Sequence, residues 1–107
     1  MTNLGQRWSS LIKPLLVLAG FLFLLPAVNP TFYADDSAET ITAAWLLGLP
    51  HPPGYPLYTL IGHLFSSLPL GGIGFRVNLL SALLAALNSL LIFQLLKKWA
   101  GLSTPWA

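Results

Sequence analysis

The chain has 107 residues, of which 55% are hydrophobic and only 7% are charged, against about 25% charged in an average soluble domain. A soluble domain of this length buries only about 60–70% of its chain surface, so it could not cover this much apolar surface, and we expect an integral membrane protein. The net charge of +2 contains no basic run that would suit nucleic acid, and the absence of cysteine excludes disulfides and thiolate metal sites.

The first apolar stretch, residues 11–28, predicts a transmembrane helix that follows a cytoplasmic N-terminus at residues 1–10. Its one charged residue is Lys13, whose ammonium can reach back to the lipid headgroups. About 18 residues at roughly 1.5 Å each cover most of a hydrocarbon core about 30 Å thick. A cleaved signal peptide is the alternative. Neither Ala27 nor Ala34 has a small residue two positions earlier, so we favour an uncleaved anchor.

Two short helices are predicted after this span, near residues 37–47 and 57–68. Asp36 or Ser37 can cap the start of the first helix. Gly48 lies just after the end of this helix and can terminate it, and Pro50 follows two residues later. The second helix lies between two prolines. Both helices are too short to cross a bilayer, so we expect the first at the membrane interface and the second interfacial or re-entrant.

A second long apolar run, residues 77–96, predicts another transmembrane helix. Its alanines and serines are small enough to let membrane helices approach one another closely. The run ends at a pair of lysines and a tryptophan, which are typical of a membrane anchor. We expect residues 97–107 to form a cytoplasmic tail.

The basic residues predict the topology. Arg7 and Lys13 place the N-terminus in the cytoplasm, and Lys97 with Lys98 place the C-terminal end there as well. Two crossings satisfy both ends, which leaves residues 29–76 as an extracytoplasmic loop. The expected fold is therefore an all-α, multi-pass integral membrane protein, with two transmembrane helices joined by a loop that carries two short interfacial helices. We expect it in a bacterial inner membrane.

The acidic residues are confined to one place in this loop. Asp35, Asp36 and Glu39 are the three acidic residues of the chain, and they fall within five positions. Charges near hydrocarbon cost free energy, so such a cluster suggests a functional site. These carboxylates could deprotonate a hydroxyl, stabilise a developing cation or, with Asp35 and Asp36 as the first candidates, bind a divalent metal. The alternative is a solvated acidic helix start.

Two histidines and an arginine are the other polar candidates. His51 is flanked by prolines, and it is either a contact to phosphate or sugar or a hydrogen-bonded loop histidine. His63 lies among apolar residues and is more typical of a structural histidine. Arg76 either binds a lipid-linked phosphate or extends to the outer headgroups. The two histidines share no metal-ligand spacing.

Three sequence blocks resemble a known family. Residues 36–39, DSAE, match an acidic D-[SA]-G-E motif with alanine in place of glycine. Residues 48–58, GLPHPPGYPLY, match G-[IV]-[AP]-H-P-P-G-Y-P-L-Y, and residues 76–82, RVNLLSA, match R-V-N-L-x-S-A. On these blocks, residues 30–86 resemble the N-terminal region of the domain-of-unknown-function 2723 family. These polytopic proteins are grouped with C-type glycosyltransferases (the GT-C fold) and have a vertebrate relative that is a transmembrane protein O-mannosyltransferase.

The resemblance implies a transferase that moves a sugar from a polyprenyl-phosphate donor to an extracytoplasmic acceptor. It implies Asp36 as the catalytic base or a metal ligand, with Glu39 as its partner. It also implies that His51, Tyr55 and Arg76 shape the site or contact the carrier phosphate. No cofactor is defined by these residues, although a divalent metal is an option.

The short chain suggests an N-terminal fragment of a GT-C-type fold, because such enzymes use many more membrane helices. We expect this fragment to be inactive alone. Its expected partners are membrane lipid, the lipid-linked sugar and the remaining helices of a parent protein, and nucleic acid is not among them. Two alternatives stay open. One is a non-catalytic two-span hairpin, a subunit or scaffold that packs on a larger complex through its second helix, and the other is cation binding by the acidic cluster.

Overall fold

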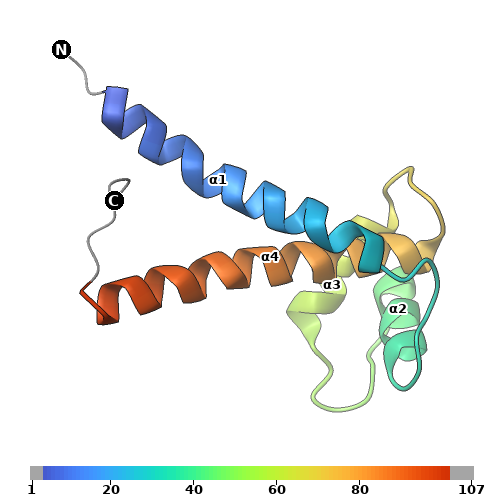
Figure 1. Cartoon of the computed structure of the whole chain (residues 1–107). Helices are drawn as coiled ribbons and strands as arrows, with labels where there is room; N and C mark the ends of the chain where they lie inside the picture. The colour runs from blue at the N-terminus through green and yellow to red at the C-terminus, as the bar shows by residue number, and fades with distance from the viewer. Residues whose placement is uncertain (1–3, 102–107) are drawn as a thin grey trace. The chain divides into compact units, whose positions relative to one another are not determined.

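The computed structural model describes residues 4–101, with side chains from residue 11 onward, and this part of the chain is helical without strands (Figure 1). The predicted all-α class is therefore confirmed. The chain divides into two compact units. One contains α1 and the part of α4 from Leu83 onward, and the other is Ala27–Ala82. The elements in chain order are α1 (Leu4–Leu24), the 3-10 turn η1 (Leu25–Ala27), α2 (Ser37–Leu46), α3 (Pro56–Ser66) and α4 (Ile73–Trp99).

The helix α4 is long and apolar enough to cross a membrane. Its 27 residues include a window of 18 with a mean hydropathy of 2.1, and among the described residues it is the one helix that meets both conditions. The predicted span 77–96 lies within it, and the helix extends four residues further at its start and three at its end. Residues Leu11–Ala27 form a shorter apolar helix, so the two-span topology stays a prediction.

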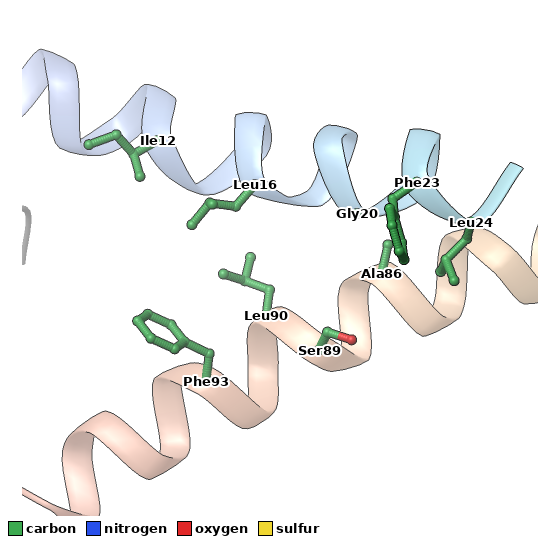
Figure 2. Close-up of a pocket in the computed structure, with 9 residues that line it drawn as sticks. All are labelled: Ile12, Leu16, Gly20, Phe23, Leu24, Ala86, Ser89, Leu90 and Phe93. Carbon is green, nitrogen blue, oxygen red and sulfur yellow. The ribbon is translucent and has the colours of Figure 1, made fainter.

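In the first unit, α1 and the C-terminal part of α4 border an apolar groove of about 740 Å³ (Figure 2). The two helices come close at Gly20 and Ala86, at one end of the groove. A Cβ at Gly20 would lie 3.6 Å from the Cβ of Ala86, which is ordinary van der Waals contact. Leucine and phenylalanine side chains from both helices cover most of the groove surface, among them Leu16, Phe23, Leu90 and Phe93.

In the second unit, α2 packs closely against α3 through small residues. Ala44 of α2 is fully buried, and a Cβ added to Gly62 of α3 would lie only 2.9 Å from the Cβ of Ala44. The absent side chain of Gly62 therefore sets how closely the two helices approach. Val77 and Leu80, from the first turns of α4, are almost completely buried and complete this core.

The end of α2 is held by a histidine and a left-handed residue. Nδ1 of His63 lies 3.0 Å from the carbonyl oxygen of Ala44 and 3.2 Å from that of Trp45. Because carbonyl oxygens only accept, Nδ1 carries the proton, and the ring serves carbonyls that the helix end leaves unpaired, in agreement with a structural role for His63. Leu47, and not Gly48 as the sequence predicted, takes the left-handed conformation (φ 53°).

This difference follows from where α2 ends. The helix ends at Leu46, two residues before the glycine, and the N–H of Gly48 donates to the carbonyl oxygen of Ala43 over 2.9 Å. A Cβ on Gly48 would lie 3.6 Å from the Cα of Ala43, so packing does not demand glycine there.

Candidate active site

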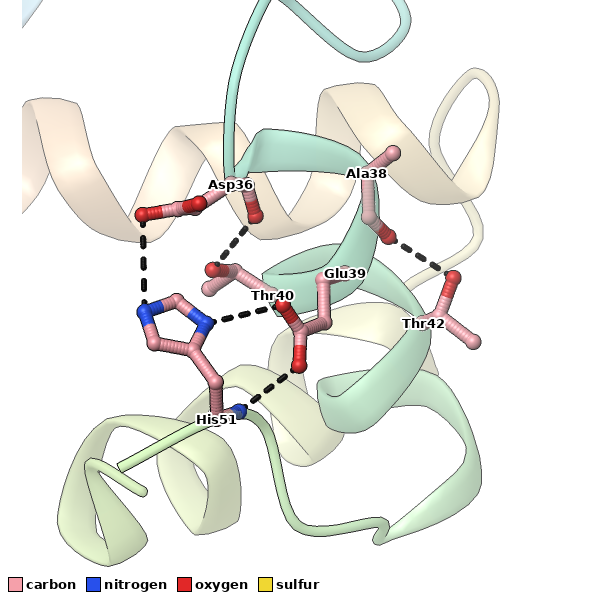
Figure 3. A network of polar contacts seen from close by, with 6 residues as sticks. All are labelled: Asp36, Ala38, Glu39, Thr40, Thr42 and His51. Carbon is pink, nitrogen blue, oxygen red and sulfur yellow. Dashed lines mark hydrogen bonds and ion pairs between the residues drawn. The ribbon is translucent and has the colours of Figure 1, made fainter. Parts of the chain in front are cut away.

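The structure brings Asp36, Glu39 and His51 together at the start of α2 (Figure 3). Oε1 of Glu39 accepts a hydrogen bond of 2.7 Å from the backbone N–H of His51, and Oε2 lies 2.8 Å from Nδ1 of the same residue. On the other side of the ring, Nε2 lies 3.6 Å from Oδ2 of Asp36. The imidazole thus lies between two carboxylates that come from one turn of helix.

Local sequence explains how α2 presents the two acids. Residues three apart lie on one face of a helix, so Asp36, which precedes α2, and Glu39 in its first turn point the same way. Thr40 holds this start, because its N–H and its hydroxyl donate to the carbonyl oxygen of Asp36 over 2.9 and 2.8 Å. Figure 3 shows both acidic side chains directed toward the ring of His51.

The predicted caps of α2 do not form. Asp36 occupies the N-cap position, but its side chain makes no capping hydrogen bond. The hydroxyl of Ser37 accepts from the N–H of Tyr33 over 3.0 Å, outside the helix. Because neither side chain turns back onto the helix amides, the carboxylate of Asp36 is directed to the histidine and to solvent, with 71% of its side chain exposed.

The Pro-rich segment after α2 positions His51. Its carbonyl oxygen accepts a hydrogen bond of 2.9 Å from the N–H of Gly54, which closes a turn around Pro52 and Pro53. Gly54 has a φ of 84°, a conformation that side chains other than glycine rarely adopt. The turn fixes the backbone after His51. Hydrogen bonds to Glu39 fix the backbone N–H and the ring of His51.

The hydrogen bonds shift the pKa values of this pair in opposite directions. The ring and then the backbone N–H of His51 stabilise the ionised form of Glu39 and lower the pKa of its carboxyl below 4.5. The hydrogen bond to Glu39, followed by the charges of Asp36 and of Glu39, raises the pKa of His51 above 6.5. At neutral pH the cluster therefore favours ionised Glu39 and a histidine that is more basic than usual.

The two acids differ in what they can still do. Both oxygens of Glu39 are engaged by His51, whereas the described contacts of the Asp36 carboxylate consist of the 3.6 Å approach to Nε2. The Asp36 carboxylate is thus the one that stays open to a bound molecule, whereas the Glu39 carboxylate is held by His51. The sequence named Asp36 as the base or metal ligand with Glu39 as its partner, and these roles stay a prediction.

The donor set also bears on the expected metal. One ligand atom each from Asp36, Glu39 and His51 lie within 4.8 Å of one another, a mixed oxygen and nitrogen set. Glu39 and the ring of His51 already satisfy each other by hydrogen bonding, so the arrangement is a hydrogen-bonded carboxylate–imidazole cluster. Asp35, the other metal candidate from the sequence, is not in this group; its backbone is left-handed, with φ 62°.

The two remaining predicted site residues lie apart from these contacts. Tyr55 precedes α3 in a left-handed conformation (φ 40°), and about half of its surface is exposed. Arg76 donates from Nε to the carbonyl oxygen of Leu70 over 2.7 Å and from its two terminal nitrogens to those of Ser66 and Gly71, each over 2.9 Å. Its guanidinium thus shapes the turn between α3 and α4.

Sequence reasoning missed two residues that anchor the start of the loop. Nδ2 of Asn78 donates to the carbonyl oxygens of Asn29 and Thr31 over 2.9 and 2.8 Å. Gly74 lies so close to this segment that a Cβ would come within 2.8 Å of the backbone of Thr31. Asn78 belongs to the RVN block, but only the fold reveals its partners, which are 47 and 49 positions away.

Fold and site together define a class of protein: a helical chain with a membrane-length helix and an exposed carboxylate–imidazole cluster in the segment before it. Residues 36–105 match the family model described as the Protein O-mannosyl-transferase TMEM260 N-terminal domain, and the chain belongs to this family. The predicted relationship to a protein O-mannosyltransferase family is thereby confirmed. Family membership and α4 together indicate a membrane protein.

Two curated relatives show how much of a longer protein these residues represent. Protein O-mannosyl-transferase TMEM260 of Mus musculus is 44% identical over 86 residues, which are 79% of this chain and 12% of the relative. Protein O-mannosyl-transferase tmem260 of Dictyostelium discoideum is 29% identical over 75 residues, 67% of this chain and 9% of the relative. The chain thus spans about a tenth of the length of these relatives. No solved structure matches it.

Proposed function

We propose that this chain forms the N-terminal segment of a membrane glycosyltransferase that moves a sugar from a polyprenyl-phosphate donor to an extracytoplasmic acceptor. Both relatives carry the name of a protein O-mannosyl-transferase. The observation that carries the proposal is the exposed carboxylate of Asp36 beside His51, within the part of the chain that the family model covers. Alone, without further membrane helices, the segment is expected to be inactive.

In this proposal Asp36 is the general base. It takes the proton from an acceptor hydroxyl while the hydroxyl oxygen attacks the anomeric carbon of the sugar, and the polyprenyl phosphate leaves with the bonding electron pair. A shallow hollow of about 350 Å³ beside Glu39, bordered by Ala38, Thr42 and Leu49, offers room for part of a substrate against α2. Arg76 holds the turn between α3 and α4.

The proposed topology accounts for the side on which transfer occurs. With α4 as one span and residues 11–28 as the other, residues 29–76 face the extracytoplasmic side, and both chain ends are cytoplasmic. The donor lipid lies in the same bilayer, so the loop meets both substrates at the membrane surface. In a bacterial cell this membrane would be the inner membrane.

The test is to replace the matching N-terminal segment of the mouse relative with this chain and to measure mannose transfer by the hybrid. Asp36→Asn should lower transfer by on the order of 10²–10⁴-fold, because the amide cannot accept the proton. Asp35→Asn is the matched control. It removes the same charge one residue away, and asparagine tolerates the left-handed conformation found there, so transfer should persist.

Two outcomes would contradict the proposal. One is an Asp36→Asn hybrid that transfers mannose at the unmodified rate. The other is an unmodified hybrid that accumulates in the membrane at the normal level and transfers nothing, which would favour a non-catalytic subunit or scaffold.

A further inference from the structure

We propose that His51 is a positioning residue for Asp36, held in one tautomer by Glu39, and that its Nε2 takes up the proton that Asp36 removes from the acceptor. This inference rests on the proposed function, because it assigns the route of the proton in that same reaction. It separates the three members of the cluster into a base, a proton acceptor behind the base, and a residue that orients this acceptor.

The tautomer follows from the contacts of Glu39. A carboxylate only accepts hydrogen bonds, so the 2.8 Å contact between Oε2 and Nδ1 requires the proton on Nδ1. Neutral His51 therefore has a free lone pair on Nε2. The second hydrogen bond runs from the backbone N–H of His51 to Oε1. It holds the backbone of the loop against Glu39, so the ring cannot move away with the loop. Glu39 thus controls both the proton position and the orientation of the imidazole.

Nε2 is the ring nitrogen that lies near Asp36. The 3.6 Å between Nε2 and Oδ2 exceeds hydrogen-bond length, but the Asp36 side chain is largely exposed and can rotate to close the gap when its oxygen is protonated. Figure 3 shows this approach on the opposite edge of the ring from Glu39. Within the described residues, the titratable groups in contact with His51 are these two acids, both from α2 or its N-cap.

The proton balance of the step is simple. The acceptor O–H bond breaks as the new bond to the anomeric carbon forms, and the proton moves to Oδ2 of Asp36. Asp36 then passes it to Nε2, which produces an imidazolium between two carboxylates. The His51 side chain is 43% exposed, so the imidazolium can release its proton to water and regenerate the site. The raised pKa of His51 supports the step, because a more basic imidazole is a better proton acceptor.

The first experiment measures the histidine in this chain without any reaction. Nitrogen NMR of the chain in detergent micelles should show neutral His51 with its proton on Nδ1 and a pKa above that of an unperturbed histidine. In Glu39→Gln, an amide N–H can donate to Nδ1, so the proton should move to Nε2 and the pKa of His51 should fall. An Nε2–H tautomer in the unmodified chain would overturn the proposal, whatever reaction the family performs.

The second experiment follows kcat against pH in the mouse hybrid. Transfer should decline as the pH falls through the pKa of His51, because the imidazolium cannot accept a proton. His51→Asn keeps an N–H where Nδ1–H was and so can keep the bond to Glu39, but it has nothing in the place of Nε2. It should lower kcat on the order of 10²-fold, leave KM unchanged and abolish the decline. In Glu39→Gln, where the proton lies on Nε2, kcat should fall as in His51→Asn and the decline should likewise disappear.

These outcomes separate the two proposals. If Asp36→Asn abolishes transfer while His51→Asn keeps the unmodified kcat and pH profile, the proposed base stands and the proton route through His51 is wrong. If Asp36→Asn transfers normally, the proposed function fails, and the NMR result alone then decides the tautomer.

Discussion

At the residue scale, the histidine and the arginine that the sequence marked as candidates perform different tasks. His51 joins the loop to α2 and faces the exposed acid, so its contacts bear on chemistry. The guanidinium of Arg76 donates to three carbonyl oxygens of the turn before α4, a fork geometry that an ammonium could not reproduce. This charged residue thus stabilises backbone carbonyl groups that would otherwise lack hydrogen-bond partners.

The interaction between His51 and Glu39 should weaken at both low and high pH. The pKa of Glu39 is lowered, so its contribution to the free energy of unfolding is complete above about pH 4.5. This contribution is lost as the pH falls through the pKa of Glu39 in the folded state. The pKa of His51 is raised, so its contribution to the free energy of unfolding is complete below about pH 6.5. This contribution is lost as the pH rises through the pKa of His51 in the folded state. Amide hydrogen exchange of His51, corrected for intrinsic rates, should be slowest between these limits. In Glu39→Gln this dependence should largely disappear; an unchanged profile would show that other groups cause it.

At the element scale, the N-terminal turns of α4 organise the second unit. Val77 and Leu80 pack into its core, and Asn78 holds the segment that leads into the loop. Gly74 allows this segment to cross the first turn of the helix at contact distance. The cluster of Asp36, Glu39 and His51 is built on α2, which packs on α3, and α3 packs on these turns of α4 through Gly62.

Gly74→Ala tests this close crossing. Its Cβ would lie 2.8–2.9 Å from three backbone atoms of Thr31, and backbone cannot move aside as a flexible side chain can. We expect a loss of about 1–3 kcal/mol in the free energy of unfolding, measured by denaturant titration in micelles. Gly72→Ala is the matched control, because the nearest atom, the carbonyl oxygen of Pro30, is at an ordinary 3.7 Å. Equal effects of the two substitutions would refute the role of the close contact.

At the scale of the whole molecule, α4 contributes to both units with different surfaces. Its first turns are buried in the second unit, whereas Leu91, Leu95 and Leu96 further along are largely exposed. Exposed leucines on a helix of membrane length are compatible with hydrocarbon or with neighbouring helices as their surroundings. This division agrees with the proposal that the chain is one part of a larger membrane protein.

The topology can be measured directly, because the chain has no cysteine of its own. Leu49→Cys, at a position that is 89% exposed, should react with a membrane-impermeant maleimide added from the extracytoplasmic side. Thr2→Cys and Ala100→Cys should react only after the membrane is opened, because two crossings return both ends to the cytoplasm. Labelling of both Thr2→Cys and Leu49→Cys in sealed cells would exclude the span at residues 11–28.

The sequence by itself determined the helical class, the membrane-length run, the family and the acids worth testing. These properties depend on local composition and on short motifs, which can be read residue by residue. It placed both short helices to within two residues of their observed limits, although α2 ends before Gly48 and its predicted side-chain caps do not form.

Only the tertiary structure decided which acid is open, which is held, and what Arg76 and Asn78 contact. The Glu39–His51 bonds join residues 12 positions apart, and those of Asn78 join residues 47 and 49 apart. Such pairings depend on how α2, α3 and α4 pack, which in turn depends on the absence of a side chain at Gly62 and Gly74. No local pattern encodes these distances, because they join residues that come together only when the helices pack.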